Sequence, residues 1–104
     1  MARFTTRVQL EGKPPESDYE ALHVEMRKRG FIRFIQDRKG NWYQLPHAEY
    51  NRTDDAKIDD VLAEAKAAAQ ASVPNRKRKI LVTASNGRRW EGLDSVTAAA
   101  VEKG

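Results

Sequence analysis

The sequence predicts an α+β protein in which two helices cover one face of an antiparallel β-sheet. Residues 3–10 alternate between apolar and polar side chains, which indicates a half-buried strand. Two segments, 18–29 and 53–71, carry apolar residues at the spacing of an amphipathic helix. Further β-rich runs lie between these helices and after the second one. Two helices of similar length need one apolar surface to cover, and a single sheet provides it.

The first helix is predicted over residues 18–29. Ser17 is followed three residues later by Glu20, and this pair predicts a capping box at the helix start. Apolar residues then recur at helical spacing as far as Met26. Gly30 follows, and we expect it to end the helix in a left-handed conformation.

A β-hairpin is predicted from residues 31–36 and 42–45. The polar segment 37–41 between them contains a glycine and is typical of a turn. Pro46 then interrupts the strand pattern, because proline within a strand marks an edge, an end or a bulge. We expect residues 48–51 to continue the strand after that break.

The second helix is predicted to start at residues 53–55, where Thr and Asp supply capping oxygens and negative charge, and to end near residue 71. A strand over residues 79–85 follows. Asn86-Gly87 is the favoured pair for a two-residue hairpin turn, so residues 88–93 should return as a final short strand. Residues 94–104 are predicted to form a short helix or a frayed tail.

This order of elements is that of a ferredoxin-like βαββαβ plait with an extra C-terminal strand. Residues 1–93 should form a single ferredoxin-like domain, with residues 94–104 as its tail. The first and third strands of the plait should be central.

Composition narrows the function classes. The chain has 104 residues, a net charge of +4 and no cysteine. Disulfides, thiolate chemistry and zinc sites built on sulfur are therefore excluded. No apolar run is long enough to span a membrane, so we expect a cytoplasmic protein without membrane insertion. The acidic residues at 54, 55, 59 and 60 form a cluster in which Asp55 and Asp59, one helical turn apart, could hold magnesium. Helix capping is the favoured interpretation, and no metal or cofactor is predicted.

The predicted open face of the sheet is basic and carries one large aromatic side chain. Strand parity places on it Arg3, Arg7, Arg33, Trp42 and Lys79. Such a face can hold a phosphate backbone and stack a base, which predicts binding of single-stranded RNA. An ordinary solvated face is the alternative. Further cations near this face would extend the track: Arg76, Lys77, Arg78, Arg88 and Arg89.

His47 is the candidate catalytic residue. RNA cleavage through the 2′-hydroxyl needs a proton acceptor, a proton donor and a cation beside the phosphate. His47, near Tyr50 and Arg52 in the sequence, could contribute to such a trio. The alternative is a surface histidine without a catalytic role.

Four segments resemble a known family: MARFTTRVQL, DYEALHVEMRKRGF, YQLPHAEYN and ILVTASNGRRWEGL. Together they are similar to GhoS-type antitoxins, the endoribonuclease component of type V toxin–antitoxin pairs. The resemblance spans residues 3–93 and implies a ferredoxin-like fold, similar to that of the CRISPR-associated small nuclease subunit. It also implies cleavage of the messenger RNA that encodes a membrane toxin. The nuclease subunit carries an aspartate at the end of its first strand, where this chain has Glu11.

Two functions are therefore expected as alternatives. The first is a bacterial RNA-binding antitoxin, either with or without endoribonuclease activity. The second is a binding module without catalysis, which would pair with a second copy or another protein through the open face or the edge strand at 88–93. Trp42 and Trp90 would then be interface anchors.

Overall fold

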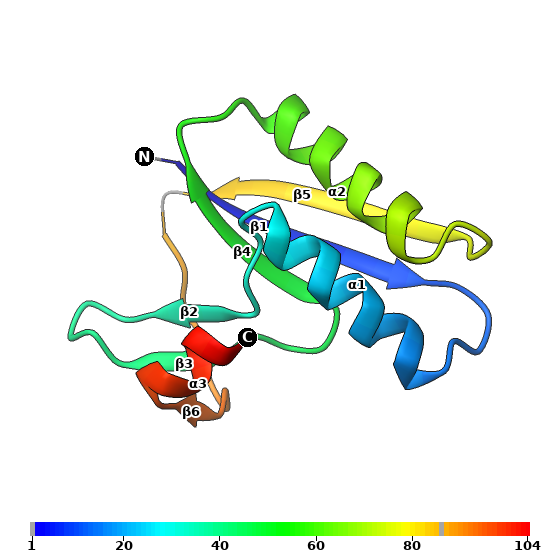
Figure 1. Ribbon diagram of the computed structural model, residues 1–104. Coiled ribbons are helices and arrows are strands. Elements are labelled where there is room, and N and C mark those ends of the chain that lie inside the picture. Colours follow the sequence, from blue (N-terminus) through cyan, green and yellow to red (C-terminus); the bar gives the residue numbers. More distant parts are fainter. Residues whose placement is uncertain (1, 86) are drawn as a thin grey trace.

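The computed structural model describes residues 2–85 and 87–104. Within these residues the chain is an α+β protein with three helices and two small antiparallel sheets (Figure 1). The elements are β1 (Ala2–Leu10), α1 (Glu16–Lys28), β2 (Phe34–Gln36), β3 (Trp42–Gln44), β4 (Glu49–Asp54), α2 (Ile58–Ser72), β5 (Arg78–Ser85), β6 (Ser95–Val96) and α3 (Ala98–Lys103). No helix among the described residues has the length and apolar character needed to cross a membrane.

The first sheet has the strand order β4-β1-β5, with antiparallel pairing on both sides of β1. The predicted alternation in β1 is confirmed, because Phe4, Val8 and Leu10 are buried whereas Arg3 and Arg7 are exposed. The first strand is therefore central, as the sequence predicted.

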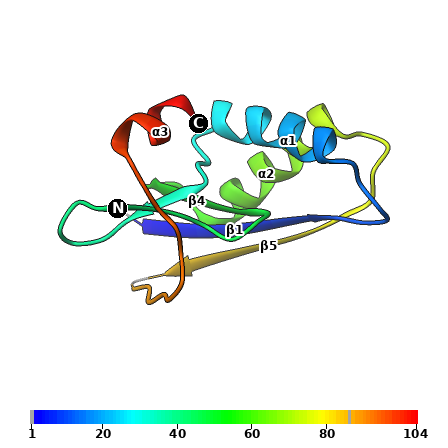
Figure 2. The same cartoon turned by 90° about the horizontal axis from the view of Figure 1, so that it is seen from below.

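Helices α1 and α2 lie on the same face of this first sheet (Figure 2). The core between the helices and the sheet contains Leu22 and Met26 of α1, Val61 of α2 and Tyr50 of β4, all fully buried. The small alanines of α2 at 65, 68 and 69 are also fully buried, which allows the helix backbone to approach the sheet closely. The opposite face of the sheet carries no helix (Figure 2).

The β2–β3 hairpin forms a second sheet instead of joining the first. The two strands pair as predicted, but β3 also pairs with β6, which gives the order β2-β3-β6. The hairpin is connected to the first sheet through an isolated bridge between Ile32 and Asn51 of β4. The predicted single sheet was therefore wrong. Pro46 separates strands that belong to different sheets.

The predicted hairpin after β5 was also wrong. The predicted turn includes Asn86, which lies outside the described residues. Residues 88–93 are not a strand; they pass across the face of the sheet opposite the helices before the chain reaches β6 and α3 (Figure 2). Arg27 of α1 donates hydrogen bonds to the carbonyl oxygens of Val101 and Glu102, and so anchors α3.

Both predicted helix starts differ from the structure. Helix α1 begins after Pro15, and Ser17 does not form the expected capping box. Thr53 and Asp54 extend β4 instead of starting α2, because they pair with β1. Gly30, by contrast, has φ +83° and ends α1 as predicted.

Candidate nucleic-acid interface

The open face of the first sheet presents a row of polar and basic residues from β1. In the antiparallel register, Arg3 lies between Thr53 and Ser85. Arg7 lies between Glu49 and Leu81. Within the described residues, the side chains of Arg3 and Arg7 form neither hydrogen bonds nor ion pairs. Both guanidinium groups are therefore available to an anionic ligand.

Arg88 attaches the segment after β5 to this open face. Its guanidinium donates a hydrogen bond of 2.6 Å to the side-chain oxygen of Asn51 and a longer one of 3.4 Å to the carbonyl oxygen of Phe4. Trp90, two residues further on, packs against Tyr43 of β3 with ring centroids 5.5 Å apart. The segment therefore connects the open face of the first sheet with the second sheet.

A cavity of about 900 Å³ lies between the open face, the segment after β5 and the β2–β3 hairpin. Both tryptophans of the chain, Trp42 and Trp90, line this cavity. Among the described residues that line it, Asp37 is the one acidic residue. The cations that line it are Arg3, Arg38, Lys39, Arg88 and Arg89. The described residues thus form a cavity wall with an excess of positive charge and two indole rings.

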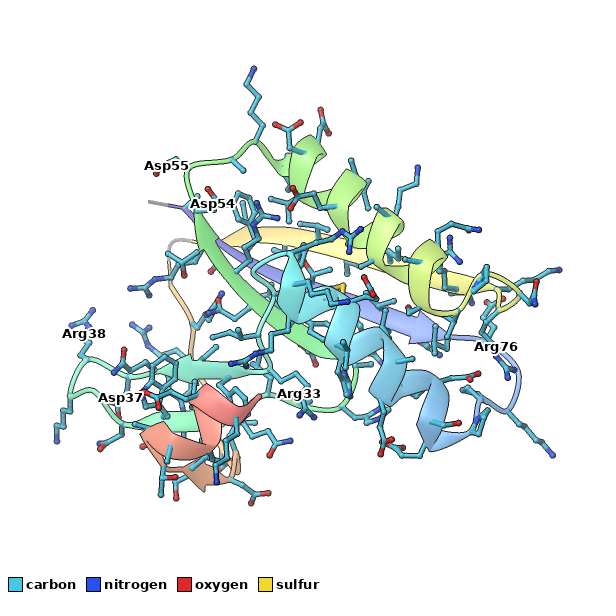
Figure 3. All side chains as sticks on the ribbon, viewed as in Figure 1. Arg33, Asp37, Arg38, Asp54, Asp55 and Arg76 are labelled. Atoms are coloured by element: carbon cyan, nitrogen blue, oxygen red, sulfur yellow. The ribbon has the colours of Figure 1, made fainter. Side chains whose placement is uncertain are left out.

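Asp37 is engaged in the hairpin turn rather than directed at the cations. Its carboxylate accepts hydrogen bonds from the backbone N–H groups of Lys39 and Asn41 and from the hydroxyl of Tyr43. The backbone bond from Asn41 is the main cause that lowers the pKa of Asp37. Figure 3 shows Asp37 and Arg38 together at the hairpin tip. Because the carboxylate is used to shape the turn, it does not neutralise the cations of the cavity by direct pairing.

Two guanidinium groups of the cavity repel each other. Burial lowers the pKa of Arg88, and the positive charge of Arg3 lowers it further. Arginine keeps its positive charge in proteins, so two like charges lie near each other here. An anion placed between Arg3 and Arg88 would relieve this repulsion, so the arrangement favours a phosphate or carboxylate ligand.

Arg33 does not lie with Arg3 and Arg7, and its predicted placement on the open face was wrong. It follows the Ile32 bridge and precedes β2, at the point where the chain changes from one sheet to the other. Its guanidinium donates a 2.8 Å hydrogen bond to the carbonyl oxygen of Gly104. Figure 3 shows Arg33 near α1 and α3. Strand parity failed here because Arg33 is not part of a strand.

The basic run at 76–79 lies at the far end of the first sheet. Leu10 pairs with Arg78, whereas Arg3 pairs with Ser85, so the two ends are roughly 24 Å apart at about 3.4 Å per residue. Arg76 forms an ion pair with Asp18 at 2.9 Å and thereby joins the loop before β5 to α1.

The other members of this basic run also have contacts at that end or are exposed there. Arg78 donates a hydrogen bond to Gln70, and Lys79 pairs with Glu11 at 3.3 Å. Lys77 is exposed. Figure 3 shows Arg76 at the end of the molecule opposite Arg38. These four cations therefore do not line the cavity.

His47 is also not among the residues that line the cavity. Its ring lies against that of Tyr19 in α1, with centroids 4.4 Å apart. Tyr50, expected beside it as a catalytic partner, is fully buried and bonded to His23 at 2.6 Å. Arg52, the third member of the predicted trio, pairs with acidic groups elsewhere. The expected trio is not assembled.

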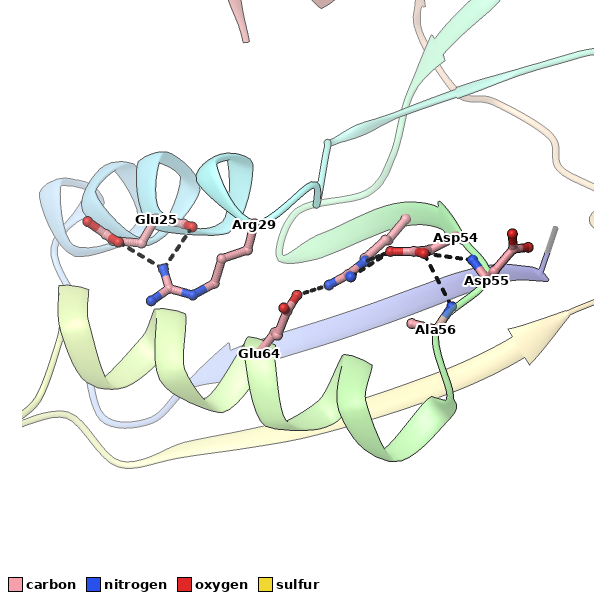
Figure 4. A network of polar contacts seen from close by, with 7 residues as sticks. Glu25, Arg29, Asp54, Asp55, Ala56 and Glu64 are labelled. Atoms are coloured by element: carbon pink, nitrogen blue, oxygen red, sulfur yellow. Dashed lines mark hydrogen bonds and ion pairs between the residues drawn. The ribbon is translucent and has the colours of Figure 1, made fainter.

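Arg52 joins β4 to α2 through the network drawn in Figure 4. It pairs with Asp54 and with Glu64 of α2, and its guanidinium lies 5.2 Å from the ring centroid of Phe31. The second oxygen of Asp54 accepts backbone N–H groups of the two following residues. The acidic residues before α2 thus shape a turn, and the described residues contain no group of three or more potential metal ligands.

Sequence reasoning missed two cavity cations, Arg38 and Lys39, because they lie in the hairpin turn rather than in a strand. A basic Arg-Lys pair immediately before Gly40 was the available signal. Trp90 was considered as an interface anchor, and it lines the same cavity as Trp42.

Comparison with models of known protein families, with curated proteins and with solved structures finds no match to this chain.

Proposed function

We propose that this protein binds single-stranded RNA in the cavity between the open face of the first sheet and the β2–β3 hairpin. The observation that carries the proposal is that five cations and both tryptophans line one cavity. Arg3 and Arg88 would hold a phosphate, and Trp42 and Trp90 would stack unpaired bases. The cavity volume of about 900 Å³ is within the range of ligand pockets, roughly 300–1,000 Å³.

A single strand suits this site better than a duplex. Bases of a duplex stack on one another, so their faces are not accessible to indole rings, whereas the bases of a flexible single strand are. Stacking on an aromatic side chain contributes about 1–3 kcal/mol per base and does not depend strongly on sequence. The site therefore favours broad recognition of unpaired RNA, and such a ligand agrees with the cytoplasmic location expected from the sequence.

We further infer that the first sheet, α1 and α2 form a ferredoxin-like core. The strand order β4-β1-β5 and the two helices on one face support this inference (Figure 2). In this interpretation the second strand of the plait is reduced to the Ile32–Asn51 bridge, because the chain then turns into the separate hairpin.

The antitoxin role implied by the resemblance is part of the proposal, with RNA binding as its basis. His47 is not assigned a part in cleavage, because it lies against Tyr19 and not in the cavity lining. Endoribonuclease activity is tested separately by incubating toxin-type messenger RNA with the protein, with and without magnesium. Intact RNA after long incubation would exclude endoribonuclease activity and leave RNA binding without cleavage as the proposed function.

Titration of a fluorescently labelled single-stranded RNA at several salt concentrations tests the binding proposal. Each phosphate contact contributes about 0.7 to the slope of log affinity against log salt for a single strand. Replacing Arg38 and Lys39 together by alanine should therefore reduce the slope by about 1.4. Because both tryptophans line the cavity, the intrinsic fluorescence of the protein should change as RNA binds.

A matched control removes two cations from the far end of the sheet. The double variant Lys77→Ala and Lys79→Ala changes the net charge equally and should leave the slope unchanged. An equal reduction of the slope in both double variants would show that the total charge alone governs binding, and would refute the proposed site. So would the absence of saturable binding at low salt, or a duplex of the same sequence that binds more tightly than the single strand.

A further inference from the structure

The outer edge of β5 is the long free edge of the first sheet. The opposite edge, formed by β4, is partly covered because Ile32 and Asn51 exchange two backbone hydrogen bonds of 2.9 and 2.6 Å. Strand β5 has eight residues and pairs with β1 on one side. Within the described residues, no backbone group bonds to its other side.

The backbone bonds identify which residues of β5 face outward. The N–H of Glu11 donates to the carbonyl oxygen of Lys77 at 2.8 Å, so odd-numbered residues of this strand direct their backbone groups toward β1. Even-numbered residues consequently direct N–H and C=O toward the free edge. They are Arg78, Ile80, Val82 and Ala84.

The side chains along this edge do little to prevent pairing. Natural proteins protect free edges with charges, proline or bulges. Residues 80–85 contain neither a charge nor a proline. Leu81, in the middle of the strand, is 65% exposed on the open face of the sheet. A strand that is uncharged over residues 80–85 and exposes a leucine is suited to pairing with a strand of the same kind.

We propose that two copies of this chain pair through antiparallel β5 strands, related by a two-fold axis at Leu81. A two-fold axis perpendicular to the sheet leaves each side chain on the same face of the sheet. Residues opposite each other must then both have odd numbers or both have even numbers, so the axis passes through a residue position and not between two residues. At Leu81 it pairs Ile80 with Val82 of the partner subunit and Arg78 with Ala84 of the partner subunit. All outward backbone groups then find partners, and the two leucines cover each other.

Strand length favours this register over the neighbouring one centred on Val82. Centred on Leu81, Lys79 faces Thr83 of the partner subunit, so no two like charges lie opposite each other. Centred on Val82, Arg78 would face none of the residues Arg78–Ser85 that make up the partner's β5. The dimer would combine two three-stranded sheets into one, with both open faces on the same side. This inference does not depend on RNA binding.

Disulfide trapping tests the register, because the native chain has no cysteine. Directly opposite residues in a non-hydrogen-bonded antiparallel pair have Cα atoms about 4.5 Å apart, which is within the range of disulfides. Mild oxidation of the variant Leu81→Cys should give a covalent dimer in high yield at micromolar protein concentration.

The control is Thr83→Cys on the same face of the same strand. In the proposed register the two copies of position 83 are about 14 Å apart, too far for a disulfide. This variant should therefore form no covalent dimer under the same oxidation. A covalent dimer in both variants, or in neither, would overturn the register.

Sedimentation equilibrium over a range of concentrations tests the dimer in the native chain. The expected result is a mass that rises from one chain to two, and Leu81→Lys should suppress this rise by placing like charges opposite each other. Val24→Lys makes the same change at a residue of α1 that is 56% exposed, and should leave association unchanged. A native chain that remains monomeric at millimolar concentration would refute the proposal.

Discussion

Lowering the pH should destabilise the protein through His23. The ring of His23 is half-buried, and its Nδ1 lies 2.6 Å from the hydroxyl oxygen of the buried Tyr50. Burial, followed by the positive charges of Arg33 and His47, lowers the pKa of His23 from 6.5 to about 4. Between these two pKa values the unfolded chain binds a proton at this residue and the folded chain does not. The contribution of this pKa difference to the free energy of unfolding is therefore fully present above about pH 6.5 and is lost as the pH falls toward 4.

The size of this effect follows from the difference between the two pKa values. A shift from 6.5 to about 4 corresponds to roughly 3 kcal/mol if it is expressed completely. Because the ring is only half-buried, solvent screening reduces the expected loss to about 1 kcal/mol between pH 7.5 and 5. Above pH 5 the carboxylates with lowered pKa values, such as Asp54, stay ionised in both states and add little.

Urea unfolding at pH 7.5, 6 and 5 measures the effect. The free energy of unfolding of the native protein should fall by about 1 kcal/mol more than that of the variant His23→Gln, whose amide can still bond to Tyr50 but does not titrate. Parallel curves for the two proteins would refute the reasoning. So would a nuclear magnetic resonance titration in which His23 is half-protonated near pH 6.5.

Three further substitutions have expected effects on the urea unfolding free energy. Replacing Arg52 by Met should cost about 1–2 kcal/mol, because Asp54 and Glu64 lose their shared partner; a loss below about 0.5 kcal/mol would show that the network is merely a surface contact. Gly30→Ala should cost about 1–2 kcal/mol, since the residue has φ +83° and the added Cβ meets no atom closer than 4.0 Å; an unchanged stability would contradict a purely conformational cost. Met26→Ala should cost about 2–5 kcal/mol because the side chain is fully buried, and a cost under 1 kcal/mol would place it outside the core.

The elements that were predicted well are those that depend on local pattern. Alternation over residues 3–10 identified β1 and assigned Arg3 and Arg7 to the exposed side. The helical spacing that followed located α1, and Gly30 located its end. In each case the signal and the structure it produces lie in the same short segment.

The elements that were predicted poorly depend on long-range pairing. Asn86-Gly87 suggested a hairpin, but the chain after β5 instead bonds through Arg88 to Asn51, which is distant in the sequence. Thr53 suggested a helix start, yet pairing with Arg3 keeps it in β4. A local propensity of a few tenths of a kcal/mol is easily outweighed by a ladder of backbone hydrogen bonds.

About half of the candidate site could be predicted from the sequence. Arg3, Trp42, Arg88 and Arg89 were expected beside an RNA strand, and the cavity includes all four. The run at 76–79 was expected there because it is basic, but composition cannot show at which end of a strand a cation lies. Only the register between β1 and β5 separates these residues from Arg3.

Asn51 connects both walls of the cavity. Its backbone N–H and C=O bond to Ile32, from which the chain continues into the hairpin, and its side-chain oxygen accepts the hydrogen bond of Arg88. The hairpin wall and the wall formed by the segment after β5 are therefore attached to the same residue of β4. The distance between the two walls depends on how firmly that residue is held. Because β4 is itself paired along β1, the residue that joins the two walls is held by the central strand of the fold.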